Sequence, residues 1–249
     1  MSNWIVRGLR RGILTTRYPL GPAEMPPAYR GRPALCGGAE PGRYELAARS
    51  CLSEAIAGDA EHPRLLLERC FQCGQCARVD PDLFEMQNDF ELTVVDDDPR
   101  AVCERLRGRV VALGRSVFVR HVDAGSDGSC EQELQAIFNP FYDANRLGIF
   151  MTATPRHADV LVVTGVVTHA MAERLQRTYE AMPEPKIVVA LGTAAASGSI
   201  FRESPAVAGP VDRIVPVDVK VAGAPPAPLT ILHGLWVALG RAVGQEAAS

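Results

Sequence analysis

Lysine is almost missing from this chain, and so are long apolar runs, a leader sequence and any surplus of positive charge. Only Lys186 and Lys220 are lysines among the 26 basic residues, a skew that reflects a GC-rich genome more than a function. No stretch reaches the ~18 consecutive apolar residues of a membrane-spanning helix. The N-terminus lacks the apolar core and cleavage site of a signal peptide, so we expect a cytoplasmic protein. The net charge of −3 gives no reason to expect a nucleic-acid partner.

Nucleotide-binding motifs are also lacking. No G-x-G-x-x-G follows any apolar run, and Gly192-Thr193 is too little to cradle a phosphate. We therefore expect neither a nucleotide nor a flavin.

Cysteine is what the chain does have, with seven residues. In a reducing compartment cysteines are usually metal ligands, catalytic groups or inert thiols rather than disulfides. Three of them, Cys70, Cys73 and Cys76, fall within CFQCGQC. This spacing indicates a metal site.

The N-terminal third reads as a helix followed by coil. Ile5, Leu9 and Ile13 recur every four residues, which predicts a short amphipathic helix over residues 2–14. Its arginines suit an anionic membrane surface, and docking on a partner subunit or on the chain's own body is an equal alternative. Residues 19–45 are rich in Pro and Gly and predict extended coil.

The second half alternates apolar runs with helical patterns, which predicts an α/β doubly wound parallel sheet. The predicted strands lie in 116–122, 158–165, 186–192 and 213–219. A helix capped by Thr168 and ended by Pro183 separates the second strand from the third. A last helix carries Leu229, Leu232, Leu235 and Leu239 on one face.

The cysteine spacing matches part of a ferredoxin pattern. In two-cluster ferredoxins a C-x2-C-x2-C-x3-C-P run gives its fourth Cys to the other cluster. Here Asp80 stands at that fourth position, before a proline. The segment ARSCLSEAI resembles the end of the first run of such a protein, which makes Cys51 the fourth ligand beside Cys70, Cys73 and Cys76.

Counting back from Cys51 by the same spacing gives Pro41, Tyr44 and Ala47, none of which is a ligand. One cluster thus keeps four thiolates and the other keeps none, so we expect one [4Fe–4S] cluster. The rival is a tetrahedral zinc on the same four cysteines.

Beyond these motifs the chain resembles a known family. Residues 1–90 are similar to the ferredoxin-type subunit of formate hydrogenlyase and related energy-converting [NiFe] hydrogenases, the counterpart of the complex I I subunit, through RGILTTRYPLGP, YRGRP and LERCFQCGQCARVDP. Residues 117–240 resemble the small, B-type subunit of these complexes through VDAGSDGSCEQELQAIFNPFYDANRLGI and VAGAPPAPLTILHGL. The resemblance implies a fusion: an N-terminal segment and ferredoxin-like domain (1–115), then a B-subunit-like α/β domain (116–249).

The family's small subunit holds a cluster of its own, and this chain departs from its ligand pattern. The resemblance maps the four ligand positions onto Asp127, Cys130, the pair Thr193 and Ala194, and Ala224. Only one of these positions is a thiol, so we expect this second cluster to be missing.

The resemblance implies an iron–sulfur subunit of a membrane-associated complex I-like or hydrogenase-related assembly, with electron transfer as its role. The expected partners are a large-subunit homologue and membrane subunits, at the cytoplasmic face of the inner membrane, with peripheral membrane contact through residues 2–14. We expect no catalytic residues in the chain itself. The alternative is a structural subunit that bridges these partners and whose cluster is structural or sensing.

Overall fold

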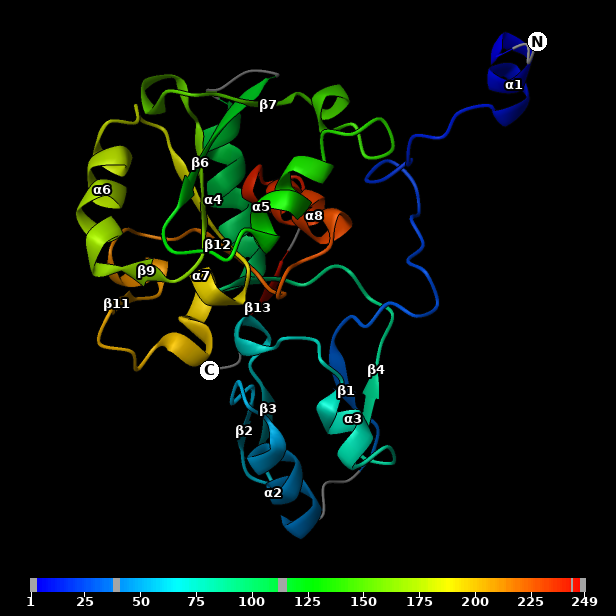
Figure 1. Cartoon of the computed structure of the whole chain (residues 1–249), viewed down its shortest axis with the longest axis vertical. Coiled ribbons are helices and arrows are strands. Elements are labelled where there is room, and N and C mark those ends of the chain that lie inside the picture. Colours follow the sequence, from blue (N-terminus) through cyan, green and yellow to red (C-terminus); the bar gives the residue numbers. More distant parts are fainter. Residues whose placement is uncertain (1–3, 38–40, 112–115, 243, 247–249) are drawn as a thin grey trace.

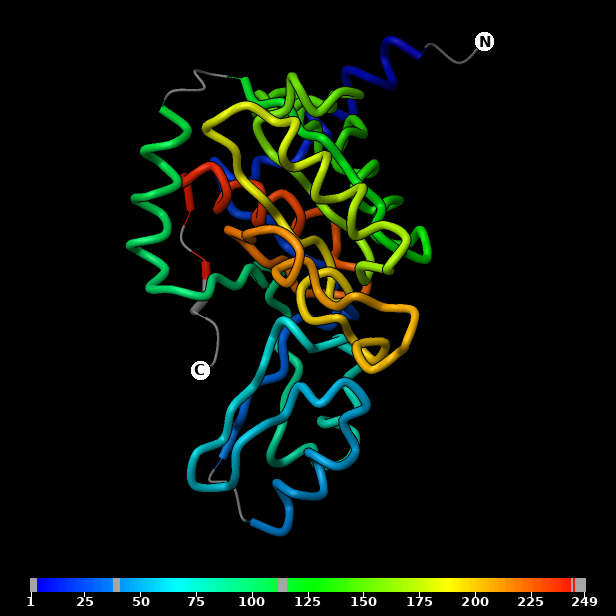
Figure 2. Tube along the Cα trace, turned by 90° about the vertical axis from the view of Figure 1, so that its left-hand side faces the viewer, coloured from blue at the N-terminus to red at the C-terminus, as the bar shows by residue number. Residues whose placement is uncertain are grey.

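The computed structural model describes residues 4–37, 41–111, 116–242 and 244–246. A larger α/β body and a smaller cysteine-bearing unit lie one above the other, and an N-terminal helix projects from the larger body (Figures 1 and 2).

The larger body is built on a seven-stranded sheet in the order β13-β5-β12-β10-β8-β6-β7. The five strands from β12 to β7 run parallel, whereas β5 is antiparallel to β12. The strands are β5 (Thr93–Val95), β6 (Val117–Asp123), β7 (Ile149–Met151), β8 (Val160–Thr164), β10 (Ile187–Leu191), β12 (Val219–Val221) and β13 (Gln245–Glu246). The predicted doubly wound α/β class is confirmed.

Helices cover both faces of the sheet, because successive side chains of a buried strand point to opposite sides. Val160 and Val162 of β8 belong to one apolar core and Leu161 and Val163 to the other. The first core is covered by α4 (Pro99–Val111), α5 (Ser129–Ala136) and α8 (Pro228–Ala238), and the second by α6 (His169–Glu180) and α7 (Thr193–Ser197).

One predicted strand is misplaced. The apolar run 213–219 predicts a strand over its whole length, but only its last residue, Val219, lies in β12. Its first residue, Arg213, is the last residue of the 3-10 helix η5 (Val211–Arg213). Pro216 has no N–H for a sheet ladder, which excludes a central strand at that position. The remaining short elements are η2 (Ala144–Leu147), η3 (Pro155–His157), β9 (Val167–Thr168), η4 (Ser199–Phe201) and β11 (Val207–Gly209).

The smaller unit carries the cysteine motif on short elements. They are β1 (Pro33–Leu35), α2 (Pro41–Ser50), β2 (Ile56–Gly58), β3 (Pro63–Leu65), η1 (Leu67–Arg69), α3 (Gln75–Val79) and β4 (Phe84–Met86). β1 pairs with β4 and β2 with β3, both antiparallel. A small core of five buried residues, Tyr44, Ala47, Ile56, Leu83 and Phe84, joins them.

The boundary predicted between residues 115 and 116 adjoins 112–115, which lie outside the described residues. Two elements that precede it belong to the larger body. β5 pairs with β12, and α4 contributes Val102, Leu106 and Val110 to the core under the sheet. The cysteine-bearing unit therefore occupies the chain between about β1 and β4.

The N-terminal segment consists of α1 (Trp4–Arg11) and a coil that crosses the larger body. The coil is held by Thr16 N–H on the Phe141 carbonyl (2.8 Å) and by Tyr18, whose ring meets Phe90 edge-on. α1 has no buried residue. Among the described residues, no helix has the length and apolar character to cross a membrane.

Candidate metal centre

Three of the four predicted ligands lie on one tight turn. Cys70 follows η1, Cys73 lies in the loop, and Cys76 is in the first turn of α3. Two residues between them have a left-handed backbone, Gln72 with φ 58° and Gly74 with φ 70°. These two reversals bend the chain around a common space, and glycine adopts that conformation without a steric penalty.

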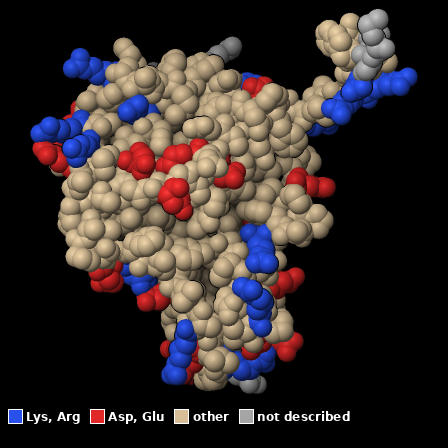
Figure 3. Space-filling view, in the orientation of Figure 1, with Lys and Arg blue, Asp and Glu red and all other residues tan. Residues whose placement is uncertain are grey.

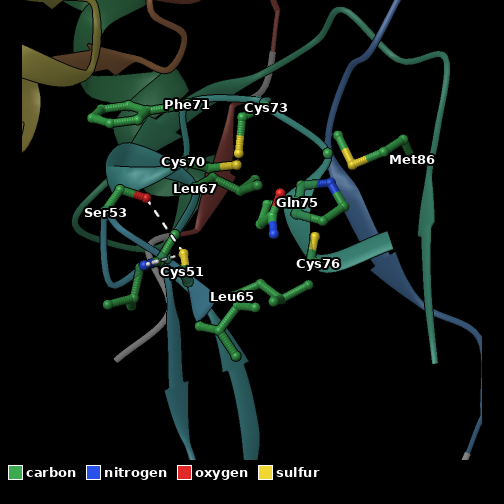
Figure 4. A pocket seen from close by; sticks show the side chains of 15 residues that line it. Cys51, Ser53, Leu65, Leu67, Cys70, Phe71, Cys73, Gln75, Cys76 and Met86 are labelled. Atoms are coloured by element: carbon green, nitrogen blue, oxygen red, sulfur yellow. Dashed lines mark hydrogen bonds between the residues drawn. The ribbon is translucent and has the colours of Figure 1, made fainter. Parts of the chain in front are cut away.

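Cys51 reaches the same space from the end of α2. Its sulfur accepts a hydrogen bond from the Ala55 N–H (3.3 Å) and lies 3.5 Å from the Ser53 hydroxyl. All four cysteines line one pocket with about 420 Å³ of empty space, part of it open to solvent. Figure 4 shows the four sulfur atoms around this pocket. The structure thus brings together the four residues that the sequence singled out.

Burial disfavours the ionised form of two of these thiols. Burial raises the pKa of Cys70 to about 12. The Gln72 N–H that donates to its sulfur lowers this pKa, whereas the neighbouring thiols Cys76, Cys51 and Cys73 raise it further. Burial likewise raises the pKa of Cys76. A cation in the pocket would reverse this, because metal-bound cysteines are thiolates and binding releases their protons.

Two arginines outside the cysteine pattern meet this turn. Arg30, from the N-terminal coil, donates to the Cys73 carbonyl at 2.8 Å, and Arg78 approaches the same oxygen at 3.4 Å. Sequence reasoning missed both. Arg78 lies only two residues after the last ligand, whereas Arg30 is separated from the motif by 40 residues and carries no local signal.

A zinc ion and a cubane cluster make different demands on these four cysteines. Within the described part of the chain, no group of three or more His, Cys, Asp or Glu side chains is placed to hold one metal ion. A tetrahedral zinc with sulfur ligands at about 2.3 Å needs sulfurs about 3.8 Å apart. A cubane cluster instead binds each thiolate to a separate iron.

The second ferredoxin site is filled by protein. Tyr44 and Ala47, at two former ligand positions, are fully buried, and the Tyr44 ring stacks on Phe84 with 6.4 Å between centroids. Asp80, at a third, forms a bidentate ion pair with Arg43 and accepts the Leu83 N–H. That ion pair holds the pKa of Asp80 below its usual value. An aromatic core and a salt bridge thus occupy the place of a cluster.

The predicted ligand positions of the α/β domain meet in a crevice at the carboxyl ends of β6, β8, β10 and β12. The crevice has about 1150 Å³ of space, part of it open to solvent, and Asp127, Cys130, Thr193, Ala194 and Ala224 all line it. Cys130 is the one thiol among these former positions, so they offer no cubane site. Burial raises its pKa to about 12.

The loop between β6 and α5 satisfies its own N–H groups. Asp123 accepts from Gly125 and Ser126, and Asp127 accepts from Ser129. Because carboxylates already occupy these donors and Asp127 is the one charged lining residue, the crevice does not suit an anion.

A polar cluster behind this loop was not foreseen from the sequence. Glu131 accepts from Ser126 (2.7 Å) and from Thr164, and His121 Nε2 lies 2.8 Å from the Thr164 hydroxyl. Burial lowers the pKa of His121, against the opposite pull of Glu131. Glu131 thus links the loop to β8.

Comparison with known proteins decides the family. Residues 128–238 match the family model described as the 20 Kd subunit of NADH ubiquinone oxidoreductase. A probable membrane-bound hydrogenase subunit, mbhJ of Pyrococcus furiosus, is 49% identical over 142 residues, which are 55% of this chain and 85% of that protein. The chain belongs to this family.

A second family model, a further relative and a solved structure are also similar to parts of the chain. Residues 67–109 match the model of the 4Fe-4S single cluster domain of Ferredoxin I, which includes three of the four pocket cysteines but not Cys51. Formate hydrogenlyase subunit 7 of Escherichia coli is 44% identical over half of each chain. A chain of the membrane-bound sulfane sulfur reductase, an archaeal respiratory membrane complex, aligns with 55% of this chain at 29% identity and a TM-score of 0.46. The predicted resemblance to hydrogenase and complex I subunits is confirmed.

Proposed function

We propose that this protein is the iron–sulfur subunit of a membrane-associated complex I-like or hydrogenase-related assembly, and that it binds one [4Fe–4S] cluster through Cys51, Cys70, Cys73 and Cys76. The observation that carries the proposal is the pocket lined by all four thiols. The match of residues 67–109 to a single-cluster ferredoxin domain supports it. The ferredoxin-like sequence around Cys51 favours the cluster over zinc.

The residues around the pocket provide hydrogen bonds and positive charge for a [4Fe–4S] cluster. When bound, it exchanges one electron at a time with another carrier. The chain's contribution is to hold it and to adjust its potential: N–H groups of Ala55 and Gln72 point at the Cys51 and Cys70 sulfurs at 3.3 Å, and Arg30 adds positive charge beside Cys73. Hydrogen bonds to sulfur and nearby charge set the reduction potential of such sites.

Iron and EPR measurements test the cluster. After anaerobic purification or reconstitution, about four irons per chain and one EPR signal in the reduced protein are expected. About eight irons would contradict the loss of the second site. Zinc without iron would refute the redox role.

We infer that the partners are a large-subunit homologue and membrane subunits. Two relatives are named for a membrane-bound hydrogenase and for formate hydrogenlyase, and a similar solved structure is an archaeal respiratory membrane complex. The proposed location is the cytoplasmic face of the inner membrane. Co-purification of the tagged chain with such subunits is expected, and a monomer recovered from its native host would contradict it.

α1 is the proposed membrane contact. It projects from the body with basic side chains along its exposed surface (Figure 3) and exposes Trp4 (78%) and Leu9 (79%) beside Arg10 and Arg11. A basic amphipathic helix binds anionic lipid surfaces. The full chain is expected to float with vesicles that contain anionic lipid and not with neutral vesicles, and Leu9→Glu should abolish flotation. No flotation with either vesicle type would contradict a membrane contact through α1.

A specific observation favours a second candidate, a structural subunit. The crevice of the α/β domain keeps one thiol among its former ligand positions, so the family's usual relay next to the large subunit is missing. Cys70→Ser in the native complex separates the two functions. A complex that assembles but loses electron transfer supports the redox role, and one that assembles with unchanged activity supports the structural role.

A further inference from the structure

The turn that carries Cys70 is held from outside the cysteine-bearing unit. Thr193, the first residue of α7, donates its hydroxyl to the Cys70 carbonyl at 3.1 Å, across the boundary between the two bodies. η1, which leads into Cys70, lies against α7. The α/β domain therefore contacts the cysteine turn at its first ligand.

Thr193 is itself rigidly placed. It is 1% exposed, its N–H donates to the Gly223 carbonyl (2.8 Å), and its hydroxyl accepts from the Gly223 N–H (3.3 Å). The hydroxyl thus donates once and accepts once, and both partners are backbone groups. It links the ends of β10 and β12 to the cysteine turn.

A second contact between the two bodies is much weaker. Arg202 pairs with Glu54, three residues after Cys51, but the Glu54 side chain is 65% exposed. Exposed ion pairs contribute little because water screens them. The Thr193 hydroxyl makes the stronger contact, since its loss removes the partner of the buried Gly223 N–H and of the partly buried Cys70 carbonyl.

We propose that Thr193 is a positioning residue for the metal centre, and that through it the α/β domain forms part of the site. The hydroxyl fixes the Cys70 carbonyl, and thereby the orientation of the turn between Cys70 and Cys73. Cys73 and Phe71 also line the crevice of the α/β domain, so the same contact sets which edge of the cysteine site faces that crevice. This inference rests on the proposed function.

The test compares Thr193→Val, which keeps the shape and removes the hydroxyl, with Thr193→Ser, which keeps the hydroxyl. In the protein without metal, amide hydrogen exchange of residues 67–76 is expected to rise about five- to tenfold in Thr193→Val and to return near wild type in Thr193→Ser. In the reconstituted protein, Thr193→Val should broaden or shift the EPR signal and change the midpoint potential. Thr178→Val, on the exposed surface of α6, is the matched control and should change neither.

The outcomes separate this inference from the proposed function. Wild-type exchange in Thr193→Val, or equal exchange in Thr193→Val and Thr193→Ser, would overturn the positioning role whether or not iron binds. A wild-type protein that takes up no iron would refute the proposed function and still leave the exchange comparison valid. If Thr193→Val does not fold, Thr193→Ala against Thr193→Ser gives the same comparison.

Discussion

At the scale of single residues, Cys51 is the proposed ligand whose assignment depends most on the interleaved ferredoxin pattern. It lies 19 residues before Cys70 in sequence, yet its sulfur lines the same pocket. We expect Cys51→Ser to lower the iron content as strongly as Cys73→Ser does, because a cubane needs four thiolates. Cys36→Ser is the matched control, since Cys36 is exposed and outside the pocket. Full iron in Cys51→Ser would remove it from the ligand set.

Arg30 is a residue whose role is electrostatic. Its guanidinium binds the Cys73 carbonyl, and reduction makes a bound cluster more negative. Arg30→Gln should therefore lower the midpoint potential, by on the order of tens of millivolts. The exposed Arg49, which pairs with Glu45 on α2, offers the control Arg49→Gln. A redox titration that gives equal potentials for both variants would contradict this role.

His233 gives the α/β domain a pH dependence. Burial lowers its pKa to about 4, with Asp89 opposing, and its Nδ1 lies 2.7 Å from the Thr93 hydroxyl. The folded state therefore resists protonation, whereas the unfolded chain binds a proton near pH 6.5. The associated stability is fully present above about pH 6.5 and is lost as the pH falls through about 4.

We expect the wild type to lose about 3 kcal/mol of unfolding free energy more than His233→Gln does between pH 7 and pH 4. Urea unfolding at both pH values measures the difference. Parallel losses in the two proteins would mean that His233 does not carry this dependence.

At the scale of elements, α2 places an aromatic ring at a position where a two-cluster ferredoxin has a ligand. Tyr44 packs on Phe84, and its hydroxyl accepts from the Arg64 N–H at 3.2 Å. Tyr44→Ala should cost about 3–5 kcal/mol of stability, and Tyr44→Phe about 1 kcal/mol. Thermal unfolding measures both, and a mild Tyr44→Ala would show that the core does not depend on the ring.

The sequence predicted the main strands of the α/β body but not the elements around the cysteines, since β1 and the start of α2 fall within residues 19–45, for which it predicts coil. Runs of β-branched residues predicted β6, β8 and β10. The recurrence of apolar residues every four positions predicted α1. It misplaced the strand before α8, because the apolar run 213–219 contains Pro216 and the ladder begins only at Val219. It also gave no sign that β5 pairs antiparallel with β12, because strand pairing over more than a hundred residues leaves no local pattern.

Some residues of the candidate site could be predicted from the sequence and others could not. The four cysteines follow a spacing rule and were found from it, whereas Arg30, Thr193 and the cluster of Glu131, His121 and Thr164 come from tertiary packing. From the sequence, Thr193 is a position where a cluster ligand is missing and part of a turn too short to bind phosphate. Its bond to Cys70 depends on the docking of two bodies that no spacing rule describes.

At the scale of the whole molecule, metal removal should affect the two bodies unequally. The two cores of the sheet contain none of the pocket cysteines, whereas Cys51 and Cys76 pack against the small core. Chelation is expected to speed amide exchange in residues 51–80 and to leave β6, β8 and β10 unchanged. Faster exchange throughout the sheet would show that the bodies unfold as one unit.

The Tyr44 core also bears on how the protein matures in the cell. A domain that depends on two clusters has little core of its own until iron arrives, whereas this one packs Tyr44 against Phe84 in a small apolar core. The chain leaving the ribosome then has a partly formed scaffold with three pocket cysteines on one turn. If the proposed single cluster is the one that binds, one insertion step would complete the site.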